Sequence, residues 1–155
     1  MKLIKLKLKN FRCYKDEIVF SIDDLTSIIG KNDVGKSAIL EALDAFFNDV
    51  VEQSDLSNSA EDNAIELTCC FQDVPVEIVL DTSEPSCPID EGILNENNQL
   101  EIKKIITFGA RKSTAVYLNA YHPSDERLEK LLSMKNGQLK SFSEELGIDL
   151  NNINT

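Results

Sequence analysis

The octet GKNDVGKS at residues 30–37 is the part of this sequence whose residue types and spacing point most directly to chemistry. It fits the phosphate-binding pattern G-x-x-x-x-G-K-[ST] at every fixed position. Gly30 allows a sharp turn, and Gly35 lets the backbone approach a phosphate where a side chain would clash. The Lys36 ammonium can reach the β- and γ-phosphates of a nucleotide, and the Ser37 hydroxyl can take one position on Mg²⁺. The octet therefore predicts a nucleotide-binding loop with Lys36 as its catalytic residue.

The backbone of this loop supplies most of the expected phosphate contacts. Successive N–H groups from about Asp33 to Ala38 can point into one concavity, and the helix that begins there adds the positive end of its dipole. The Asn32 side chain either hydrogen-bonds a phosphate or only shapes the loop. The predicted nucleotide-binding residues of the loop are Gly30, Asn32, Asp33, Val34, Gly35, Lys36, Ser37 and Ala38.

Such a loop needs a strand before it and a helix after it. Residues 25–29 are apolar and rich in β-branched side chains, which predicts a buried strand. Residues 37–47 predict a helix, with Leu40, Leu43 and Phe47 on one apolar face at i, i+3 and i+7. Both flanks therefore favour the phosphate-binding interpretation over a chance glycine turn.

The composition limits the class of protein. A chain of 155 residues with 42% hydrophobic residues can form one domain with a real core. No apolar run approaches the ~20 residues that span a bilayer, and the N-terminus does not resemble a signal peptide. The cysteines form no C-x-x-C pair, so they indicate reduced thiols of a cytoplasmic protein rather than a zinc site or disulfide framework. They are Cys13, Cys69, Cys70 and Cys87.

The charge is unevenly distributed along the chain, whose formal net charge is −11. Residues 1–15 carry six basic side chains and no acidic one. Between Lys36 and Lys103 there are sixteen acidic side chains and no basic one, so that stretch is unsuited to contact a phosphate backbone. If this protein touches nucleic acid, the basic N-terminal strand or a region outside these residues makes the contact. We interpret the acidic stretch as a solvated face.

The remaining elements are mostly strands. Residues 4–9 alternate apolar and lysine side chains, which predicts a strand with one face of each kind, and a turn at 10–14 leads to a second strand at 17–22. Residues 48–63 predict a polar loop with a helical turn. Further strands are expected at 64–71 and 76–80, paired as a hairpin around 73–75, and at 100–108 and 114–121, joined by a turn at 109–113.

Residues 81–99 are rich in Asp, Glu and Asn and predict a mobile loop. A helix capped by Ser124 is expected to end near residue 136, and a shorter one to run from about Gln138 to Leu146 and end at Gly147. Acid pairs at Asp23-Asp24, Glu61-Asp62 and Asp90-Glu91 fit no calcium-loop pattern and are interpreted as solvated loops. His122 has no partner at motif spacing, which favours a surface or capping role.

The order of these elements defines the expected fold class. Two strands precede the strand of the phosphate-binding loop, and four strands in hairpins follow its helix. A doubly wound domain would instead alternate strands with helices. We therefore expect an α+β fold, in which a strand–loop–helix nucleotide-binding unit is embedded in a largely antiparallel β-lobe and followed by two short helices. The expected parts are a core at 1–48, a β-lobe at 64–121 and a helical segment at 124–147.

The segments LKLKNFRCY at residues 6–14, IIGKNDVGKS at 28–37 and LEAL at 40–43 together resemble the start of RecF/SMC-type ATPases. The NDV at residues 32–34 is most similar to the OLD-family branch, whose members pair an ABC-type ATPase head with a C-terminal Toprim nuclease. The resemblance is specific over residues 1–47 and only topological beyond them. It implies ATP and Mg²⁺ as cofactors, an ATPase head that forms a homodimer in the full-length protein, and work on DNA in processing, repair or anti-phage defence.

The resemblance also implies a role for Arg12, because the arginine of the N-F-R turn lies close to the nucleotide phosphates in such heads. Tyr14 is expected to be structural. An ABC-type head further needs a Q-loop glutamine, a signature sequence and a Walker B Asp-Glu pair. No LSGG-like segment occurs here, Gln138 falls on a predicted helix, and Asp81 follows an apolar strand but is succeeded by Thr82 instead of glutamate.

We therefore expect this chain to be the N-terminal part of a longer ATPase, one that binds nucleotide, hydrolyses it poorly alone and does not cut DNA. Two alternatives stay open. A small GTPase or nucleotide kinase would need a D-x-x-G switch, where this chain has Glu84, or a lid with arginines, which residues 37–102 lack. A non-catalytic regulator would bind nucleotide or a partner protein without turnover.

Overall fold

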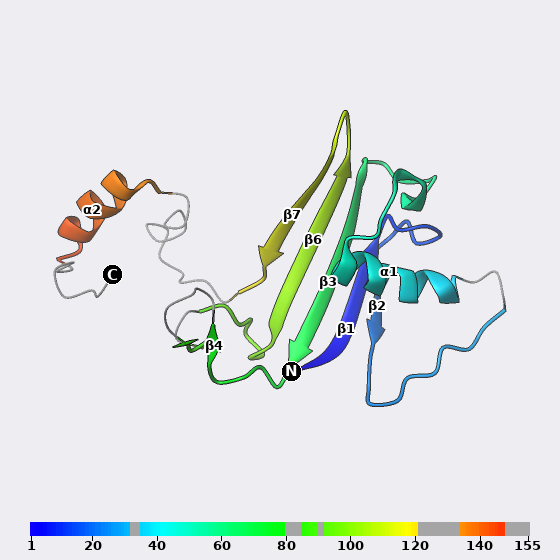
Figure 1. The fold of residues 1–155 in the computed structure, drawn as a ribbon, viewed down its shortest axis with the longest axis horizontal. Helices are drawn as coiled ribbons and strands as arrows, with labels where there is room; N and C mark the ends of the chain where they lie inside the picture. Colours follow the sequence, from blue (N-terminus) through cyan, green and yellow to red (C-terminus); the bar gives the residue numbers. More distant parts are fainter. Residues whose placement is uncertain (32–34, 80–84, 90–91, 121–133, 148–155) are drawn as a thin grey trace. The chain divides into compact units, whose positions relative to one another are not determined.

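The structure, a computed structural model, describes residues 1–31, 35–79, 85–89, 92–120 and 134–147 (Figure 1). The chain divides into two compact units, residues 1–121 and residues 122–155. The first unit contains helix α1 (Lys36–Asn48), the 3₁₀ turn η1 (Gln53–Asp55) and every strand found among the described residues. The described part of the second unit contains helix α2 (Asn136–Glu145).

The main sheet has five strands in the order β2-β1-β3-β6-β7, and every neighbouring pair is antiparallel. This confirms the α+β expectation of a largely antiparallel lobe. The predicted strands at 4–9, 17–22, 64–71, 100–108 and 114–121 all form, with small shifts at their ends. Their bounds are β1 Lys2–Lys9, β2 Ile18–Ser21, β3 Ala64–Gln72, β6 Leu100–Phe108 and β7 Lys112–Leu118.

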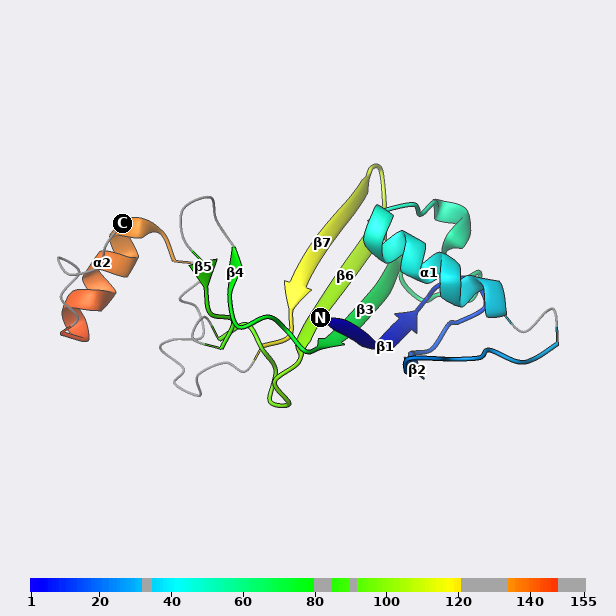
Figure 2. The ribbon, with the colours of Figure 1, turned by 60° about the horizontal axis from the view of Figure 1, so that its bottom comes forward.

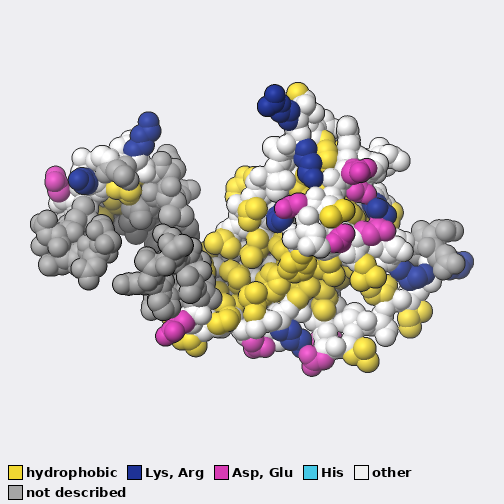
Figure 3. Space-filling view, in the orientation of Figure 1, with side chains coloured by type: hydrophobic (Ala, Val, Ile, Leu, Met, Phe, Trp, Pro, Cys, Tyr) yellow, Lys and Arg dark blue, Asp and Glu magenta, His cyan; other side chains and the backbone are white. Residues whose placement is uncertain are grey.

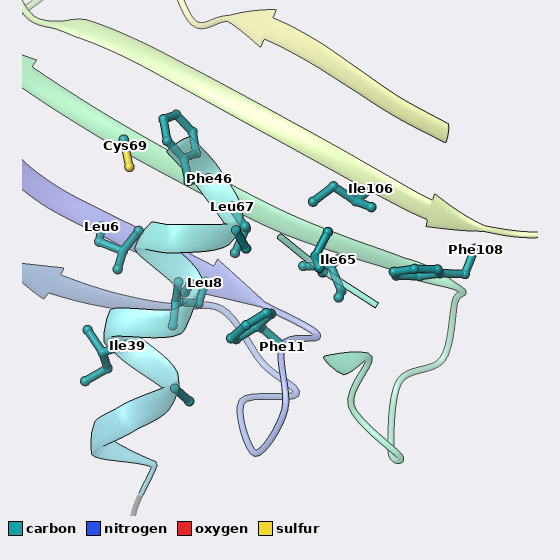
Figure 4. Close-up of a cluster of buried hydrophobic side chains, with 14 of the residues drawn as sticks. Leu6, Leu8, Phe11, Ile39, Phe46, Ile65, Leu67, Cys69, Ile106 and Phe108 are labelled. Atoms are coloured by element: carbon teal, nitrogen blue, oxygen red, sulfur yellow. The ribbon is translucent and has the colours of Figure 1, made fainter. Parts of the chain in front are cut away.

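Alternation along the strands gives the sheet two chemically different faces. Leu6 and Leu8 of β1 are fully buried, as are Ile65 and Leu67 of β3, whereas the lysines of β1 occupy the intervening positions. Helix α1 lies across the apolar face, and the core side chains fill the space between helix and sheet (Figures 2 and 4). The predicted apolar and lysine faces of the first strand are therefore confirmed.

The expected buried face of α1 was wrong. The residues that pack on the sheet are Ala38, Ile39, Ala42, Ala45 and Phe46. Leu40 is 64% exposed and Phe47 is 56% exposed, while Leu43 is only partly buried. Apolar residues lie on more than one side of the helix, so periodicity alone did not identify the face that meets the sheet, which carries three small alanines.

The predicted strand at residues 25–29 was also wrong. Residues 22–31 contain no strand, and Leu25 and Ile29 are 87% and 93% exposed. In Figures 1 and 2 this segment runs outward from β2 toward α1 without a strand beside it. A strand needs a neighbour to take its backbone hydrogen bonds, and among the described residues nothing pairs with this apolar run.

The predicted hairpin between residues 64–71 and 76–80 does not form. Instead, β3 pairs with β1 on one side and β6 on the other, so it is the central strand of the sheet. The shorter β4 (Ile78–Val79) pairs with β5 (Pro85–Ser86) in a separate two-stranded sheet. Strand β3 thus pairs with the distant, basic strand β1 and not with the segment that follows it in sequence.

Part of the predicted loop at 81–99 is ordered, since it contributes β5 and buries Pro88 and Leu94. The predicted short helix is confirmed as α2, and Gly147 follows it with a left-handed φ of 69°. The helix expected after Ser124 lies outside the described residues.

The described cysteines are all free thiols. Cys69 and Cys70 are buried in β3, and burial raises the pKa of the Cys69 thiol to about 12. That thiol is therefore protonated and unreactive at neutral pH.

Candidate nucleotide-binding site

Gly35 meets the conformational demand that the sequence pattern placed on it. It is the residue before α1 and has φ 83° and ψ 18°, in the left-handed region that glycine enters without strain. A Cβ atom there would overlap Sγ of Cys13 and lie 3.0 Å from Oη of Tyr14. Both the dihedral angle and the close neighbours therefore require glycine at this position.

Lys36 is the first residue of α1, and its side chain folds back over the loop. Its Nζ donates hydrogen bonds to the carbonyl oxygens of Gly30 (2.5 Å) and Lys31 (2.7 Å). These two bonds hold the ends of the octet together. The ammonium is thus already at the loop, where phosphate oxygens can replace carbonyl oxygens as its partners.

The other predicted loop residues are placed as follows. Ser37 is an exposed residue in the first turn of α1, whereas the Ala38 side chain is buried in the core. The first-turn N–H groups of a helix have no intrahelical acceptor and are available to an anion. Residues 32–34, which include Asn32, Asp33 and Val34, lie outside the described residues.

The turn at residues 10–14 packs against the nucleotide-binding loop, although 20 residues separate them in sequence. Tyr14 donates a hydrogen bond through Oη to the Gly35 carbonyl at 3.3 Å, and its ring packs edge-on against Phe20. Burial raises the pKa of the Tyr14 hydroxyl. Tyr14 thus has the structural role expected for it, because it fixes the turn beside Gly35.

Arg12, in the same turn, is held by two carboxylates. Its Nε and Nη2 each lie 3.0 Å from Oδ1 of Asp55, and its Nη1 contacts Oε2 of Glu41 on α1. The Arg12 backbone N–H also donates to the Asp55 carbonyl at 2.7 Å. Neither carboxylate was identified from the sequence as a partner of Arg12, because Glu41 and Asp55 lie 29 and 43 positions away and no pattern connects them to that arginine.

These residues line a hollow of about 310 Å³ beside α1. Its walls also carry the carboxylates of Asp44 and Glu52. Arg12 is therefore the one cation among four acidic side chains in the described lining of this hollow. No signal in the sequence gathers them, since they come from a turn, a helix and a 3₁₀ segment.

The basic N-terminal strand does not present a free cationic surface. Lys7 pairs with Glu101 at 2.6 Å and Lys9 with Glu66 at 2.9 Å. Lys2 pairs with Asp24, and Lys15 pairs with Glu61. Carboxylates from later parts of the chain therefore neutralise most of the basic segment. Among the described residues, Lys5 is the β1 lysine without a carboxylate partner, and this strand is a weak candidate for binding a phosphate backbone.

Of the remaining candidate residues, Asp81 and His122 lie outside the described residues, and only Gln138 lies within them. Gln138 is on α2, where its side-chain oxygen accepts a hydrogen bond from the Lys135 N–H at 3.0 Å. Within the described ranges, no group of three or more His, Cys, Asp and Glu residues is arranged to hold a metal ion. The same ranges contain no helix with the length and apolar character needed to span a membrane.

The glycine loop, the helix start and the lysine together define a P-loop nucleotide-binding protein, and comparison with known proteins places it more closely. The AAA ATPase domain family matches residues 1–155, and the chain belongs to this family. It is an ABC-class ATPase head that resembles the OLD and RecF proteins.

Two curated relatives support this assignment in sequence. An OLD nuclease from Thermus scotoductus is 38% identical over 76 residues, which cover 44% of this chain and 14% of that protein. The DNA replication and repair protein RecF from Chlamydia caviae is 49% identical over 43 residues, which cover 28% of this chain and 12% of RecF. The matched segments of the chain thus span less than a sixth of the length of either relative.

Two solved structures share the fold. One comes from work on the ATP-driven dimerization and DNA stimulated activation of SMC ATPases, with a TM-score of 0.51, 15% identity, and coverage of 100% of this chain and 85% of that one. The other is the SMC head domain from Thermotoga maritima, with a TM-score of 0.51, 16% identity, and coverage of 79% of this chain and 39% of that one. These similarities confirm an ABC-ATPase-like fold.

Proposed function

We propose that this chain binds Mg·ATP at the P-loop and forms the nucleotide-binding portion of an ATPase head. The observation that carries the proposal is the geometry of Gly35 and Lys36 at the start of α1. A left-handed glycine, which nothing larger can replace, directly precedes a helix N-terminus and a lysine already folded over the loop. This combination suits an anionic phosphate chain.

The residues present fit a nucleotide and its metal ion. Lys36 holds the β- and γ-phosphates, the loop and first-turn N–H groups hold phosphate oxygens, and the exposed Ser37 hydroxyl provides one ligand for Mg²⁺. When bound, Mg²⁺ neutralises charge on the phosphates. Gly30, Asn32, Asp33, Val34 and Ala38 contribute through the backbone of the loop, and Arg12 approaches from the neighbouring turn.

Turnover depends on more than these residues, and the exposed apolar surface supports that view. Leu40 and Phe47 on the outer face of α1, and Leu25 and Ile29 before the P-loop, stand largely in water. Figure 3 shows hydrophobic side chains gathered on the face that carries α1. A helix that is apolar on both sides is typical of one covered on both sides. We infer that a further layer of the head covers this face and supplies the Walker B and signature residues.

The biological role follows from the relatives and is part of the proposal. One relative is named as a nuclease and another as a DNA replication and repair protein. We propose that the full-length protein acts on DNA in processing, repair or anti-phage defence, and that its heads form a homodimer. Because the β1 lysines are largely paired, the DNA contact is assigned to regions beyond this sheet.

Titration calorimetry of the 155-residue chain with Mg·ATP, Mg·ADP and Mg·GTP tests the proposal, with Lys36→Ala as its control. We expect binding that prefers ATP and falls at least tenfold in Lys36→Ala, because the lysine charge on the phosphates is hard to replace. A preference for GTP would favour the small-GTPase alternative. Unchanged binding by Lys36→Ala would refute the site, and rapid multiple turnover by this chain alone would refute the requirement for a further layer.

A further inference from the structure

The two carboxylates that hold Arg12 are anchored very differently. The Asp55 side chain is 14% exposed, and its second oxygen, Oδ2, accepts a hydrogen bond from the Glu52 N–H at 2.9 Å. The Asp55 carbonyl also accepts from the Arg12 N–H. Asp55 is therefore fixed at both its backbone and its side chain, and it holds the Nε/Nη2 edge of the guanidinium in one orientation.

Glu41 is anchored only by its contact with Arg12. Its side chain is 42% exposed as a whole, but Oε2, the oxygen that contacts Nη1 of Arg12, is inaccessible to water and accepts no hydrogen bond among the described residues. The guanidinium side chain itself is 41% exposed. This contact contributes little, because the rest of both side chains is open to water, which weakens the attraction between the charges. The buried Oε2 also lacks a hydrogen bond that would offset the loss of its water contacts. The Glu41 contact can be broken while the Asp55 contacts remain.

The position of this arrangement links it to the nucleotide site. Glu41 lies five positions after Lys36 on α1, whose N-terminus closes the P-loop. Arg12 precedes Cys13 and Tyr14, the two residues that contact Gly35. With Asp44 and Glu52 in the same hollow, the surroundings of Arg12 carry more negative than positive charge. An incoming phosphate therefore meets an arginine whose charge is already compensated.

We propose that Glu41 occupies Arg12 in the nucleotide-free protein and that a nucleotide phosphate replaces Glu41, while Asp55 keeps the guanidinium oriented. This inference rests on the proposed nucleotide site and adds two residues to it. Asp55 is a positioning residue, and Glu41 is an internal competitor of the ligand. The exchange trades one carboxylate partner of Nη1 for a phosphate oxygen, so Arg12 keeps three anionic contacts in both states.

A double-mutant cycle between Arg12 and Glu41, read by calorimetric binding of Mg·ATP, tests the exchange. We expect Glu41→Gln to tighten binding about two- to fivefold, the range that corresponds to an exposed ion pair. In the Arg12→Ala background the same substitution should leave the affinity unchanged. Asp55→Asn should weaken binding, because Arg12 loses its orientation. Circular dichroism checks that each variant is folded.

Asp44→Asn is the matched control, because Asp44 lies on the same helix and hollow but bonds Asn48 at 2.6 Å instead of Arg12. It removes the same charge and should give less than half of the Glu41→Gln gain. An equal gain from Asp44→Asn, or a Glu41→Gln gain that persists without Arg12, would overturn the exchange while leaving the nucleotide site intact. Binding by Glu41→Gln when the wild type binds nothing would support it. Absence of binding in every variant would overturn the nucleotide site and the exchange together.

Discussion

At the scale of single residues, the close packing around Gly35 ties the P-loop to the turn that precedes β2. The left-handed φ of 83° is one constraint, and the Cys13 and Tyr14 side chains against its Cα are another. The sequence pattern predicts the first constraint, because the motif needs glycine there. The second depends on a turn 20 residues earlier, and only the folded chain shows it.

Gly35→Ala is therefore expected to be destabilising. The left-handed backbone costs an alanine about 1–2 kcal/mol, and the overlap with Cys13 adds to it. Denaturant unfolding measures the loss of stability, and calorimetry should show a parallel loss of Mg·ATP binding. Gly109→Ala is the control, since a Cβ there would lie 4.0 Å from the Arg111 carbonyl in ordinary contact. Equal stability of the two variants would contradict this account of Gly35.

At the scale of elements, α1 has two apolar faces of which the sheet covers one. Phe46 is 4% exposed and packs in the core, whereas its neighbour Phe47 is 56% exposed and makes T-shaped ring contacts with Phe46 and Phe71. At the end of the helix, Lys104 bonds Asp49 at 2.8 Å. This pair lowers the pKa of the Asp49 carboxyl and fixes the helix end to β6.

The two adjacent phenylalanines provide a test of this asymmetry. Phe46→Ala should lower the free energy of unfolding by about 3–5 kcal/mol, because it leaves a cavity between helix and sheet. Phe47→Ala should lower the free energy of unfolding by less than about 1.5 kcal/mol, because the side chain is mostly exposed and loses little more than its contacts with two aromatic rings. Urea unfolding of both variants measures the difference. Similar losses would mean that both faces of α1 are covered in the isolated chain.

The polar face of the sheet is held together across three strands by Glu66. This carboxylate of β3 lies 2.5 Å from Lys103 of β6 and 2.9 Å from Lys9 of β1. Hydrogen bonds from Lys103 and then Lys9 lower the pKa of the Glu66 carboxyl. On the face opposite α1, ion pairs connect neighbouring strands, whereas the α1 face is stabilised by apolar packing.

The lowered pKa gives a signed dependence of stability on pH. The folded-state pKa of Glu66 is below its unfolded value of 4.5, so its pairs stabilise the fold above that value. The contribution is lost as the pH falls through the folded pKa. As the pH falls from about 6 to about 3, the free energy of unfolding of the wild type should decrease by up to about 1 kcal/mol more than that of Glu66→Gln. Unfolding curves measured across this range would contradict the assignment if the two proteins lost stability in parallel.

At the scale of the whole molecule, the unusual feature is the apolar surface on the α1 side. Leu25 and Ile29 form an extended apolar run without a strand neighbour, and Leu40 and Phe47 extend the exposed area onto the helix. Exposed apolar side chains gathered on one face of a protein mark a site of association. In this chain it borders the P-loop, which fits a head whose second layer lies over the same helix.

We expect the isolated chain to self-associate through this surface. The Leu40→Gln, Phe47→Gln double variant should remain monomeric to higher concentration in sedimentation velocity, with a change in unfolding free energy below about 2 kcal/mol. Tyr117→Gln is the control. Tyr117 of β7 lies directly opposite Lys103 of β6, which bonds Glu66. Because paired residues share a face, Tyr117 lies on the polar face of the sheet, opposite α1. If it reduced association as strongly, the α1 face would not be the contact.

The sequence by itself determined the elements whose signals are local. The glycine, lysine and serine spacing of the P-loop, the helix after it, the alternating β1 and the turn between β6 and β7 all follow from short-range rules of conformation. The family resemblance over residues 1–47 rests on the same local segments. The family match and the SMC-like fold confirmed that assignment.

Only the tertiary structure decided which partners these elements take. The pairing of β3 with β1 instead of residues 76–80, and the choice of Ala42 and Phe46 over Leu40 and Phe47 for the core, depend on surfaces that meet from distant parts of the chain. The same holds for the carboxylates on Arg12. Residues 25–29 show the limit most clearly: their β-branched sequence favours a strand, but a strand exists only where a neighbour accepts its backbone hydrogen bonds.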